Sequence, residues 1–466
     1  MKRNFKTQSA IIIFFGGILL LIYSCKKQDA WLNAKQLQGD VVPRTLADYQ
    51  AVLDWNPAMN DRESISGLLG TDNLYMKDAD YAATDQQTAS LYSWQNTIWA
   101  NGTSSDWSDL YASMEYANVV LDGIAGMNAQ QAGYSNLKGE ALFYRGFALY
   151  NLAQVFCKPY SAASANTDMG VPVRLSSDAN ILYPRGTLQQ TYLQMISDVT
   201  ASANLLDKQP LTIYRPSTNA ANALLAKIYL VMGDYSNAGT YANKVLLNGT
   251  SLLDFNNTTL ASLNNYYRFP PNGINNPEII FYASCSDYAA ISASPRTRGS
   301  VDTNLYNSYN DNDLRKSLFY VSLNGTERFR GDYAASGGVF CGIATNEVYL
   351  IRAECNARQG NTSPAMADLN KLLKNRYATG TFTNLTAADA TTALQLVLQE
   401  RRKELPFTAN IRWEDLRRLN TDPTFRVTVT RIINGTVYTL PPNDPKYVLP
   451  IPDNEIQLSG IQQNPR

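Results

Sequence analysis

The sequence predicts a mainly α-helical fold, in which paired helices form a scaffold that carries long irregular insertions and a few short β-hairpins. Three observations support this class. Apolar residues recur at helical spacing over long stretches, a glycine separates helices that follow one another directly, and strand-like alternation is confined to short runs. The scaffold is expected over about 106–250 and 345–420, and the insertions over about 55–105 and 255–340.

The first 24 residues have the pattern of an export signal. Three basic residues precede an apolar run over 10–23, which is shorter than the roughly 20 residues that span a bilayer. Ser24 then precedes Cys25, as a small residue does in a bacterial lipobox. We predict a lipoprotein signal peptide over 1–24, with the lipid carried by Cys25. A plain signal peptide followed by a fortuitous cysteine is the alternative.

The composition excludes several classes of function. The chain has 466 residues, with 40 Lys and Arg against 40 Asp and Glu, so it lacks the basic field that a nucleic-acid partner requires. It has no histidine, which excludes Ser-His-Asp and Cys-His catalysis and every His-ligated metal site. Its aromatic residues, led by 29 tyrosines, suit partly exposed binding surfaces, although many of these rings are expected in the core.

Beyond the signal we expect a tether over 25–42 and one composite domain over 43–466. The domain contains four cysteines: Cys157, Cys285, Cys341 and Cys355. Their spacing matches no metal or redox motif and does not choose among the three possible disulfide pairings. Cys355 lies within a helical pattern and is expected to be a buried thiol.

The first long helices follow in order along this domain. Asp106 is the expected N-cap of a helix whose apolar stripe starts at Trp107 and continues to residue 124, and a second stripe covers 139–156. Thr187 and Gln190 make a capping-box pattern in front of a third helix.

Two helical hairpins then repeat one spacing of small residues. Ala226, Ala238 and Ala242 surround a turn at Gly233, in a pair of helices opened by Ser217. Small residues let two helices approach closely where they cross. The pair resembles a tetratricopeptide repeat.

The second hairpin lies about 100 residues further along the chain. Ala353, Ala365 and Leu369 repeat the spacing around Gly360, with Ser363 and Pro364 expected as N-cap and first helical residue. The distance between the hairpins predicts a broken array with insertions instead of a regular solenoid.

Two charged segments and one turn have structural interpretations. Glu400 and Glu404 are i,i+4 neighbours on a helix with basic residues between them, so an ion-pair cluster is favoured over a catalytic pair. Arg412, Arg417 and Arg418 are expected to extend that cluster. Asp311-Asn312-Asp313 lacks the features of a calcium loop and is predicted to be a solvated turn. Asn434-Gly435 predicts a β-hairpin near the carboxyl end.

Ten blocks of sequence, taken in order, resemble the SusD/RagB family of outer-membrane nutrient-binding lipoproteins. They include NEVYLIRAE at 346–354 and ERRKEL at 400–405, and the whole set covers 43–49, 107–118, 139–145, 170–173, 214–221 with the turn at 229–235, 276–280, 346–354, 400–405, 412–418 and 449–456. One departure is the run 406–411, where the family has an acidic residue and a glycine.

The resemblance implies a right-handed superhelix of four tetratricopeptide-like hairpins with a loop-rich ligand-binding portion. It also implies a lipid-anchored protein at the outer-membrane surface that captures oligosaccharides, or in some members peptides, and delivers them to a SusC-like TonB-dependent transporter. No reaction and no cofactor are implied. Two other classes stay open: a two-carboxylate glycoside hydrolase and a tetratricopeptide-type assembly factor that binds protein.

Family members build the ligand surface from the two insertions. Sugar recognition needs aromatic faces together with side chains that bond hydroxyl groups, and both insertions supply them. The expected ligand-binding residues are Asp72, Asn73, Tyr75, Tyr92, Trp94, Trp99, Asn101, Tyr288, Arg296, Tyr306, Tyr309 and Arg328, of which Trp94, Trp99, Asp72 and Tyr288 rank first.

Overall fold

The structure is a computed structural model that describes residues 42–292 and 297–466. The chain divides after Thr45, and Leu46–Arg466 forms one compact unit. The predicted signal peptide, the lipidated Cys25 and one predicted ligand residue, Arg296, lie outside the described residues.

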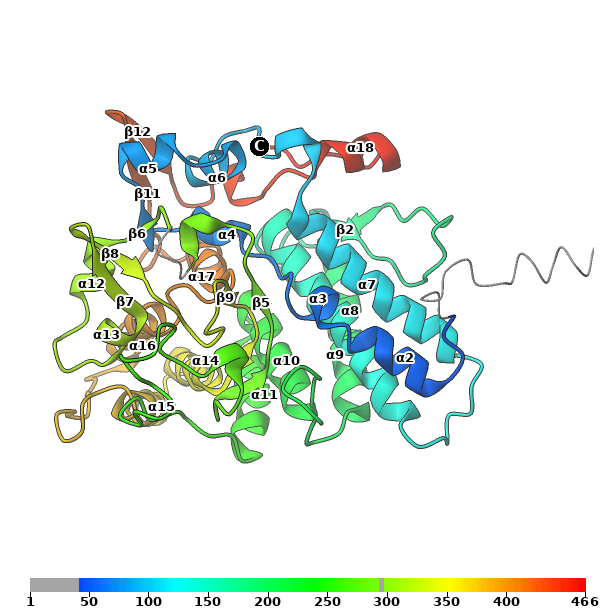
Figure 1. Ribbon diagram of the computed structural model, residues 1–466, viewed down its shortest axis with the longest axis horizontal. Coiled ribbons are helices and arrows are strands. Elements are labelled where there is room, and N and C mark those ends of the chain that lie inside the picture. Colours follow the sequence, from blue (N-terminus) through cyan, green and yellow to red (C-terminus); the bar gives the residue numbers. More distant parts are fainter. Residues whose placement is uncertain (1–41, 293–296) are drawn as a thin grey trace, which may run out of the picture. The chain divides into compact units, whose positions relative to one another are not determined.

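Helices dominate the compact unit, so the predicted mainly α-helical class is confirmed (Figure 1). The long ones are α7 (Ser105–Ile124), α8 (Tyr134–Phe156), α9 (Leu188–Leu205), α10 (Thr218–Met232), α11 (Tyr235–Leu247), α14 (Thr345–Arg358), α15 (Thr362–Lys374) and α16 (Ala390–Glu404). The shorter ones are α2 (Leu46–Leu53), α3 (Asn56–Met59), α4 (Ser66–Leu69), α5 (Asp78–Ala82), α6 (Gln86–Tyr92), α12 (Thr303–Asn307), α13 (Arg315–Phe319), α17 (Ile411–Leu419) and α18 (Asp453–Ser459).

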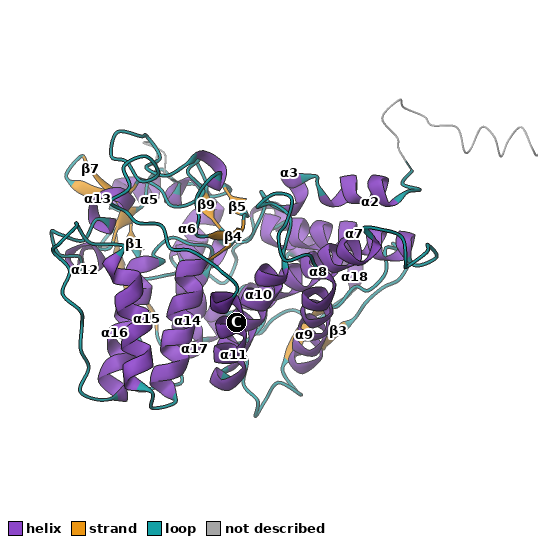
Figure 2. Ribbon diagram, turned by 90° about the horizontal axis from the view of Figure 1, so that it is seen from below, coloured by secondary structure: helices purple, strands orange, loops and turns teal. Residues whose placement is uncertain are grey.

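The long helices pack against their neighbours in a continuous series. Helix α8 contacts α7 and α9, α10 contacts α9 and α11, and α14 joins α11 to α15 and α16. Figure 2 shows the carboxyl-terminal half of this series side by side, with most of the strands gathered on one side of it. The two predicted helical hairpins, α10–α11 and α14–α15, are therefore adjacent in space although the chain separates them by about 100 residues.

Small residues make these close contacts possible. Ala226, Ala238 and Ala242 are fully buried between α10 and α11, as the spacing predicted. At the α8–α9 contact, a Cβ atom placed on Gly146 would lie 2.4 Å from Cγ2 of Val199, so only glycine fits there without displacing α9. The helix spacing is thus set by side-chain volume at a few positions.

Strands occur only as six antiparallel pairs in the described part of the chain. They are β1 (Leu74–Tyr75) with β6 (Ser300–Val301), β2 (Met169–Pro172) with β3 (Arg185–Thr187), β4 (Ile279–Phe281) with β10 (Ile343–Ala344), β5 (Ser284–Cys285) with β9 (Val339–Phe340), β7 (Tyr320–Leu323) with β8 (Thr326–Phe329), and β11 (Val429–Ile433) with β12 (Thr436–Leu440). In the β1–β6 pair Leu74 lies opposite Val301, so this pair joins the two insertions.

Helix boundaries differ from the predictions at three places. The N-cap of α7 is Ser104, because the Asp106 carboxylate accepts a hydrogen bond from the Ile65 backbone N–H at 3.2 Å instead of capping its own helix. Helix α8 begins at Tyr134, upstream of the predicted stripe. The N-cap of α15 is Asn361, so Ser363 and Pro364 lie inside its first turn.

Other local predictions are confirmed. Thr187 and Gln190 form both hydrogen bonds of a capping box at α9. Ser217 caps α10, and Gly233 ends it in the left-handed conformation. Cys355 is a buried free thiol, as are Cys157, Cys285 and Cys341.

The predicted ion-pair cluster at Glu400 and Glu404 is confirmed and is fully buried. Arg315 bonds Asp313, Glu400 and Glu404, while Arg376 bonds Glu278 and Glu404. Asp311 and Asn312 form an exposed turn, as predicted, but Asp313 is buried because it pairs with Arg315, which corrects the prediction at that residue. Arg412 and Arg418 form further ion pairs, with Asp72 and Glu354 respectively.

Arg417 does not extend this cluster. Its guanidinium is buried and donates to the backbone carbonyl of Cys157 instead of a carboxylate.

The described helices differ in length and in apolar character. None of those within 42–292 and 297–466 combines the length and the apolar character that crossing a bilayer requires. The same residues bring together no group of three Cys, Asp or Glu side chains arranged to hold a metal ion.

Candidate functional site

The tryptophans that ranked first among the predicted ligand residues lie inside the protein. Trp94 is 2% exposed, belongs to a small core with Trp413 and Tyr447, and donates its Nε1–H to the Gly70 carbonyl at 3.1 Å. Trp99 donates to the Pro450 carbonyl at 2.6 Å. Both rings therefore fasten the first insertion to the carboxyl-terminal segment.

Asp72 and Asn73 also make internal contacts. Two oxygen atoms of Asp72 accept from Arg412 at 2.7 Å each. Although burial raises the pKa of Asp72, the charges of Arg412 and Arg402 lower it well below its usual range. The Asn73 amide donates to the Pro406 carbonyl at 2.6 Å and accepts from Arg402 at 2.9 Å.

Four more predicted residues are buried, and each has an internal polar partner. The Tyr92 hydroxyl accepts from the Met76 N–H, and the Tyr288 hydroxyl accepts from Gln87. The Tyr309 hydroxyl donates to the Lys403 carbonyl, and Arg328 donates to the Thr297 carbonyl. The predicted residues that keep exposed surface are Asp72, Tyr75, Asn101 and Tyr306.

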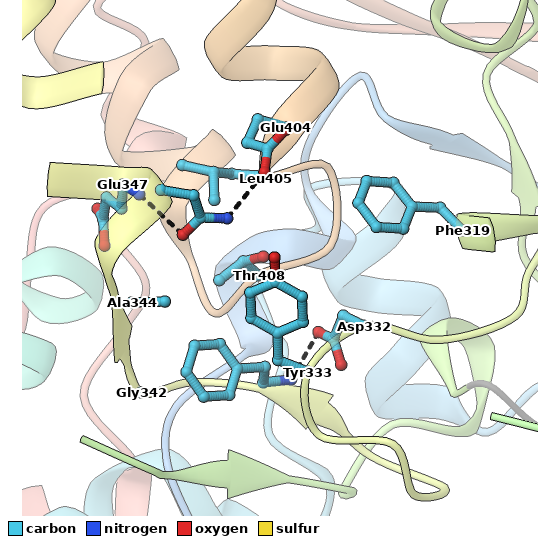
Figure 3. A pocket seen from close by; sticks show the side chains of 11 residues that line it. Phe319, Asp332, Tyr333, Gly342, Ala344, Glu347, Glu404, Leu405 and Thr408 are labelled. Carbon is cyan, nitrogen blue, oxygen red and sulfur yellow. Dashed lines mark hydrogen bonds between the residues drawn. The ribbon is translucent and has the colours of Figure 1, made fainter. Parts of the chain in front are cut away.

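A small cavity lies beside the buried ion-pair cluster (Figure 3). It has a volume of about 20 Å³, and Glu404, Thr408, Tyr333 and Phe319 are among the residues around it. This volume is that of a single water molecule, so the cavity belongs to the interior of the protein and is too small for a sugar.

A much larger cavity is an open groove of about 990 Å³, which lies between α7, the segment 169–185 and the carboxyl-terminal segment 452–462. We call it the α7 groove. In Figure 1, α18 lies above β2 and beside the upper end of α7. Its volume is at the upper end of the range typical of small-molecule sites.

One wall of the groove is a single face of α7. Trp107, Tyr111 and Glu115 are spaced four residues apart and therefore lie along one side of the helix. The two rings are 4.8 Å apart between centroids. The Tyr111 hydroxyl donates to the Pro172 carbonyl at 2.8 Å, which fixes the ring against the β2 side of the groove.

The opposite wall is the loop between β2 and β3, which hydrogen bonds hold in place. Its outermost side chain, Leu182, is 75% exposed, and Tyr183 is half-buried beside it. The carboxylate of Asp122, at the end of α7, accepts from the Ser177 N–H at 2.7 Å and from the Ser177 hydroxyl at 2.9 Å. The loop is therefore fastened to the helix that it faces.

The third wall is formed by α18 and the residues after it. The Trp107 Nε1–H donates to a Glu455 carboxylate oxygen at 3.3 Å. Arg185 donates to the Gly170 carbonyl at 2.7 Å and to the Gln462 carbonyl at 2.8 Å, and so links two walls of the groove. Arg185 Nη2 has no hydrogen-bond partner among the described residues.

The groove contains balanced charges. Arg174 and Arg185 stand against Glu115 and Glu455, and the closest approach of Arg174 to Glu115 is 3.7 Å. Burial and the charge of Asp122 raise the pKa of Glu115, against the opposing effect of Arg174. Burial lowers the pKa of Arg185. Such a surface offers donors and acceptors together without a strong net field.

The sequence interpretation missed this groove. It assigned Trp107 to the core stripe of its helix, which is half right, because the ring is buried and also borders the groove. A usable signal was the apolar run Ile181-Leu182-Tyr183, which belongs to neither a helical nor a strand pattern. An apolar run without a packing partner points to exposed apolar surface.

Two family models match the chain. One, described as starch-binding and associating with the outer membrane, matches residues 31–230. The other, described as the SusD family, matches residues 345–466. SusD-like protein P2 of Formosa agariphila is 27% identical over 210 residues, a match that covers 44% of this chain and only 40% of that protein.

Solved structures share the fold. A SusD superfamily protein from Bacteroides thetaiotaomicron superimposes with a TM-score of 0.70 at 22% identity, covering 91% of this chain and 100% of that one. A SusD-like carbohydrate binding protein from Bacteroides vulgatus gives a TM-score of 0.67 at 20% identity, covering 89% and 97%. The two family models, one at each end of the chain, together with the Formosa relative show that this protein belongs to the SusD/RagB family.

Proposed function

We propose that this protein is a cell-surface lipoprotein that binds an oligosaccharide in the α7 groove and delivers it, unchanged, to a SusC-like TonB-dependent transporter. The observation that carries the binding step is the composition of the groove, in which aromatic rings on two walls flank paired charged groups. Family membership supports the choice of a sugar as ligand, since one matching family model is described as starch-binding.

The chemical groups of a sugar chain match the side chains that line the groove. A pyranose ring has an apolar face of C–H groups, which packs on aromatic rings such as Tyr183 and the exposed edge of Tyr111. Its hydroxyl groups both donate and accept, so they require donors and acceptors within one site. Arg174 and Arg185 supply donors, and Glu115 and Glu455 supply acceptors.

Calorimetric titration of the full-length chain with neutral oligosaccharides of different linkage tests the binding step. Tyr183→Ala and Glu115→Gln should each weaken the binding of the best ligand by roughly tenfold, since each loses about 1.4 kcal/mol of contact. Tyr241→Ala is a matched control, because Tyr241 is a half-buried ring on α11 that stacks on Tyr229, and it lies outside the groove.

Two results would contradict this proposal. Binding that is unaffected by both groove substitutions would place the ligand elsewhere, for example at the predicted residues that keep exposed surface, Asp72, Tyr75, Asn101 and Tyr306. Release of smaller sugars from the oligosaccharide by the pure protein would favour the glycoside-hydrolase class instead.

A further inference from the structure

A second surface, in the insertion over 255–340, has an arrangement of charge that the α7 groove lacks. It consists of Tyr266, Tyr267 and Arg268 on one loop and Arg330 directly after β8. The loop closes on itself, because the Ser262 N–H donates to the Arg268 carbonyl at 2.8 Å. The Arg330 N–H donates to the Phe319 carbonyl at 2.7 Å, so the second arginine is held by the β7–β8 hairpin. We call these four residues the arginine-pair surface.

Both arginines lie beside Tyr266, Arg268 two residues along the chain and Arg330 against its ring, and neither has a carboxylate partner among the described residues. Neither Arg268 nor Arg330 forms an ion pair with an Asp or Glu of the described residues, whereas Arg315, Arg376 and Arg401 are each bonded to at least two carboxylates. Burial and the positive charge of Arg330 lower the pKa of Arg268. Two neighbouring like charges disfavour one another, and an anion placed between them removes that cost.

The guanidinium groups also keep unused donors. Arg268 donates through Nη1 to the backbone carbonyls of Leu263 and Asn265. The Nε atoms of both Arg268 and Arg330 are buried and have no hydrogen-bond partner among the described residues, so a ligand cannot reach them directly. Nη2 of Arg268 and both Nη atoms of Arg330 also form no hydrogen bond with the described residues and are not among the buried atoms, so they are the donors that a ligand can meet. A planar guanidinium with free donors matches the two oxygen atoms of a carboxylate or sulfate.

Aromatic rings complete the surface. The Arg330 guanidinium lies 4.5 Å from the centroid of the Tyr266 ring, and the Tyr267 ring meets Tyr266 edge-on at 4.7 Å. Tyr266 is 47% exposed. The ring holds Arg330 by a cation–π contact while leaving surface free for another group.

We propose that the arginine-pair surface binds an oxyanion, a carboxylate or a sulfate, carried on a sugar chain. The guanidinium groups of Arg268 and Arg330 contact the oxyanion, and the rings of Tyr266 and Tyr267 contact the sugar that bears it. This inference rests on the proposed function for the sugar part of the ligand. The oxyanion part rests on the two unpaired arginines alone.

The test compares matched ligands on the full-length chain. Oligogalacturonate and its methyl ester differ in charge at the same sugar, and a sulfated oligosaccharide and its desulfated form make a second pair. Titration should show at least tenfold tighter binding of the charged member in either pair. The preference should fall as NaCl is raised from 20 to 500 mM, because ions screen exposed charges, and this measurement requires no substitution.

Substitutions then locate the site. Arg268→Gln and Arg330→Gln should each remove most of the preference for the charged ligand and leave binding of the neutral ligand unchanged. Arg426→Gln is the matched control, because Arg426 is an exposed arginine far along the chain, before β11. Thermal unfolding of each variant checks that the fold is intact.

The possible outcomes separate this inference from the proposed function. Equal binding of charged and neutral sugars overturns the inference and leaves the proposed function standing. Competition by inorganic sulfate or by polyglutamate as strong as by the acidic sugar overturns the sugar-borne oxyanion in favour of a free anion or a peptide. If the unmodified protein binds no sugar at all, charged or neutral, both the inference and the proposed function are overturned.

Discussion

Buried arginines fix the two insertions to the helical scaffold. Arg376 follows α15, yet it bonds Glu278 in the second insertion and Glu404 at the end of α16, each at 2.8 Å. It also donates to the Leu253 carbonyl at 2.7 Å. Arginine suits such a position because its planar group has five donors in a fixed geometry. One side chain can therefore join three separate segments of the chain.

In contrast to these paired arginines, some carboxyl groups are buried without a basic partner. Glu63 is buried and accepts a hydrogen bond from the Asn151 amide at 2.8 Å, and no Lys or Arg of the described residues pairs with it. Burial raises the pKa of Glu63 to about 8, and the charges of Asp109 and Asp61 act in the same direction. The folded protein therefore holds a proton on Glu63 at neutral pH.

This proton predicts how the free energy of unfolding depends on pH. The unfolded chain loses the Glu63 proton near pH 4.5, but the folded chain keeps it to about pH 8. The stabilising contribution of this group is therefore complete below pH 4.5 and is lost as the pH rises toward 8. The free energy of unfolding, measured with urea, should fall as the pH rises from 5 to 8. For Glu63→Gln this fall should be smaller than for the unmodified chain by roughly 2 to 4 kcal/mol. Parallel pH curves for the two proteins would contradict the expectation.

At the scale of elements, the β11–β12 hairpin shows how much a two-residue signal determines. Asn434-Gly435 predicted the hairpin, and Ile433 lies opposite Thr436 across that turn. Both turn residues have positive φ, 48° and 78°, as a type I′ turn requires. The Asn434 N–H also donates to the Asp78 carboxylate at 2.8 Å, so the hairpin tip is joined to α5.

Substitution of the turn glycine tests this account. Gly435→Ala should lower the free energy of unfolding by about 1 to 2 kcal/mol, because a Cβ atom disfavours the left-handed conformation. A Cβ on Gly435 would meet nothing within 4 Å, so backbone strain alone acts there. Gly126→Ala is the control, since Gly126 has equally open surroundings without a positive φ, and it should change the free energy by less than about 0.5 kcal/mol. Equal effects of the two substitutions would disprove the turn argument.

The elements that could be predicted are those whose signal is local. The capping box at Thr187 and the glycine stop at Gly233 depend on residues a few positions apart. Asp106 failed as an N-cap because its carboxylate finds a partner at Ile65, on a different segment of the chain. Such a preference depends on tertiary packing and cannot be read from neighbouring residues.

The candidate site was less predictable than the fold for a similar reason. Tyr and Trp have the same apolar face and polar atom whether they bind a sugar or fill a core. Trp94 satisfies its Nε1–H with the Gly70 carbonyl, and only the folded chain brings these groups together. The α7 groove requires three segments to meet, so no single stretch of sequence carries its pattern.

At the scale of the whole molecule, the two insertions and the helices share one large hydrophobic core. It extends from Tyr49 near the start of the described chain to Ile461 near its end. A smaller core under α14, α15 and α16 includes Leu350, Leu372 and Val397. The two proposed ligand surfaces therefore stand on a continuous packed base, and we expect the unit to bind without large internal rearrangement.

The proposed lipid anchor and the proposed delivery of the ligand to a transporter can both be tested in the bacterial membrane. In the native bacterium, the full-length chain should partition into detergent and copurify with a TonB-dependent transporter from the outer membrane. Cys25→Ser should move the protein to the aqueous phase, because the acyl chains are attached through that cysteine. Cys355→Ala, which changes a buried thiol, should leave partitioning unchanged.

Two results would oppose that account. Detergent partitioning that persists in Cys25→Ser would exclude lipidation at this residue. Recovery of the wild-type chain without any transporter, under conditions that keep outer-membrane complexes together, would count against delivery to such a partner.

The loop that forms the outer wall of the α7 groove is fastened at its two ends and at Ser177, while its apolar tip at Leu182 is free of the helices. Lengthening or shortening that tip costs little conformational entropy, so the scaffold would tolerate it. Changes of sequence confined to this one loop would therefore alter the outer wall of the groove, while the helices beneath it stay as they are.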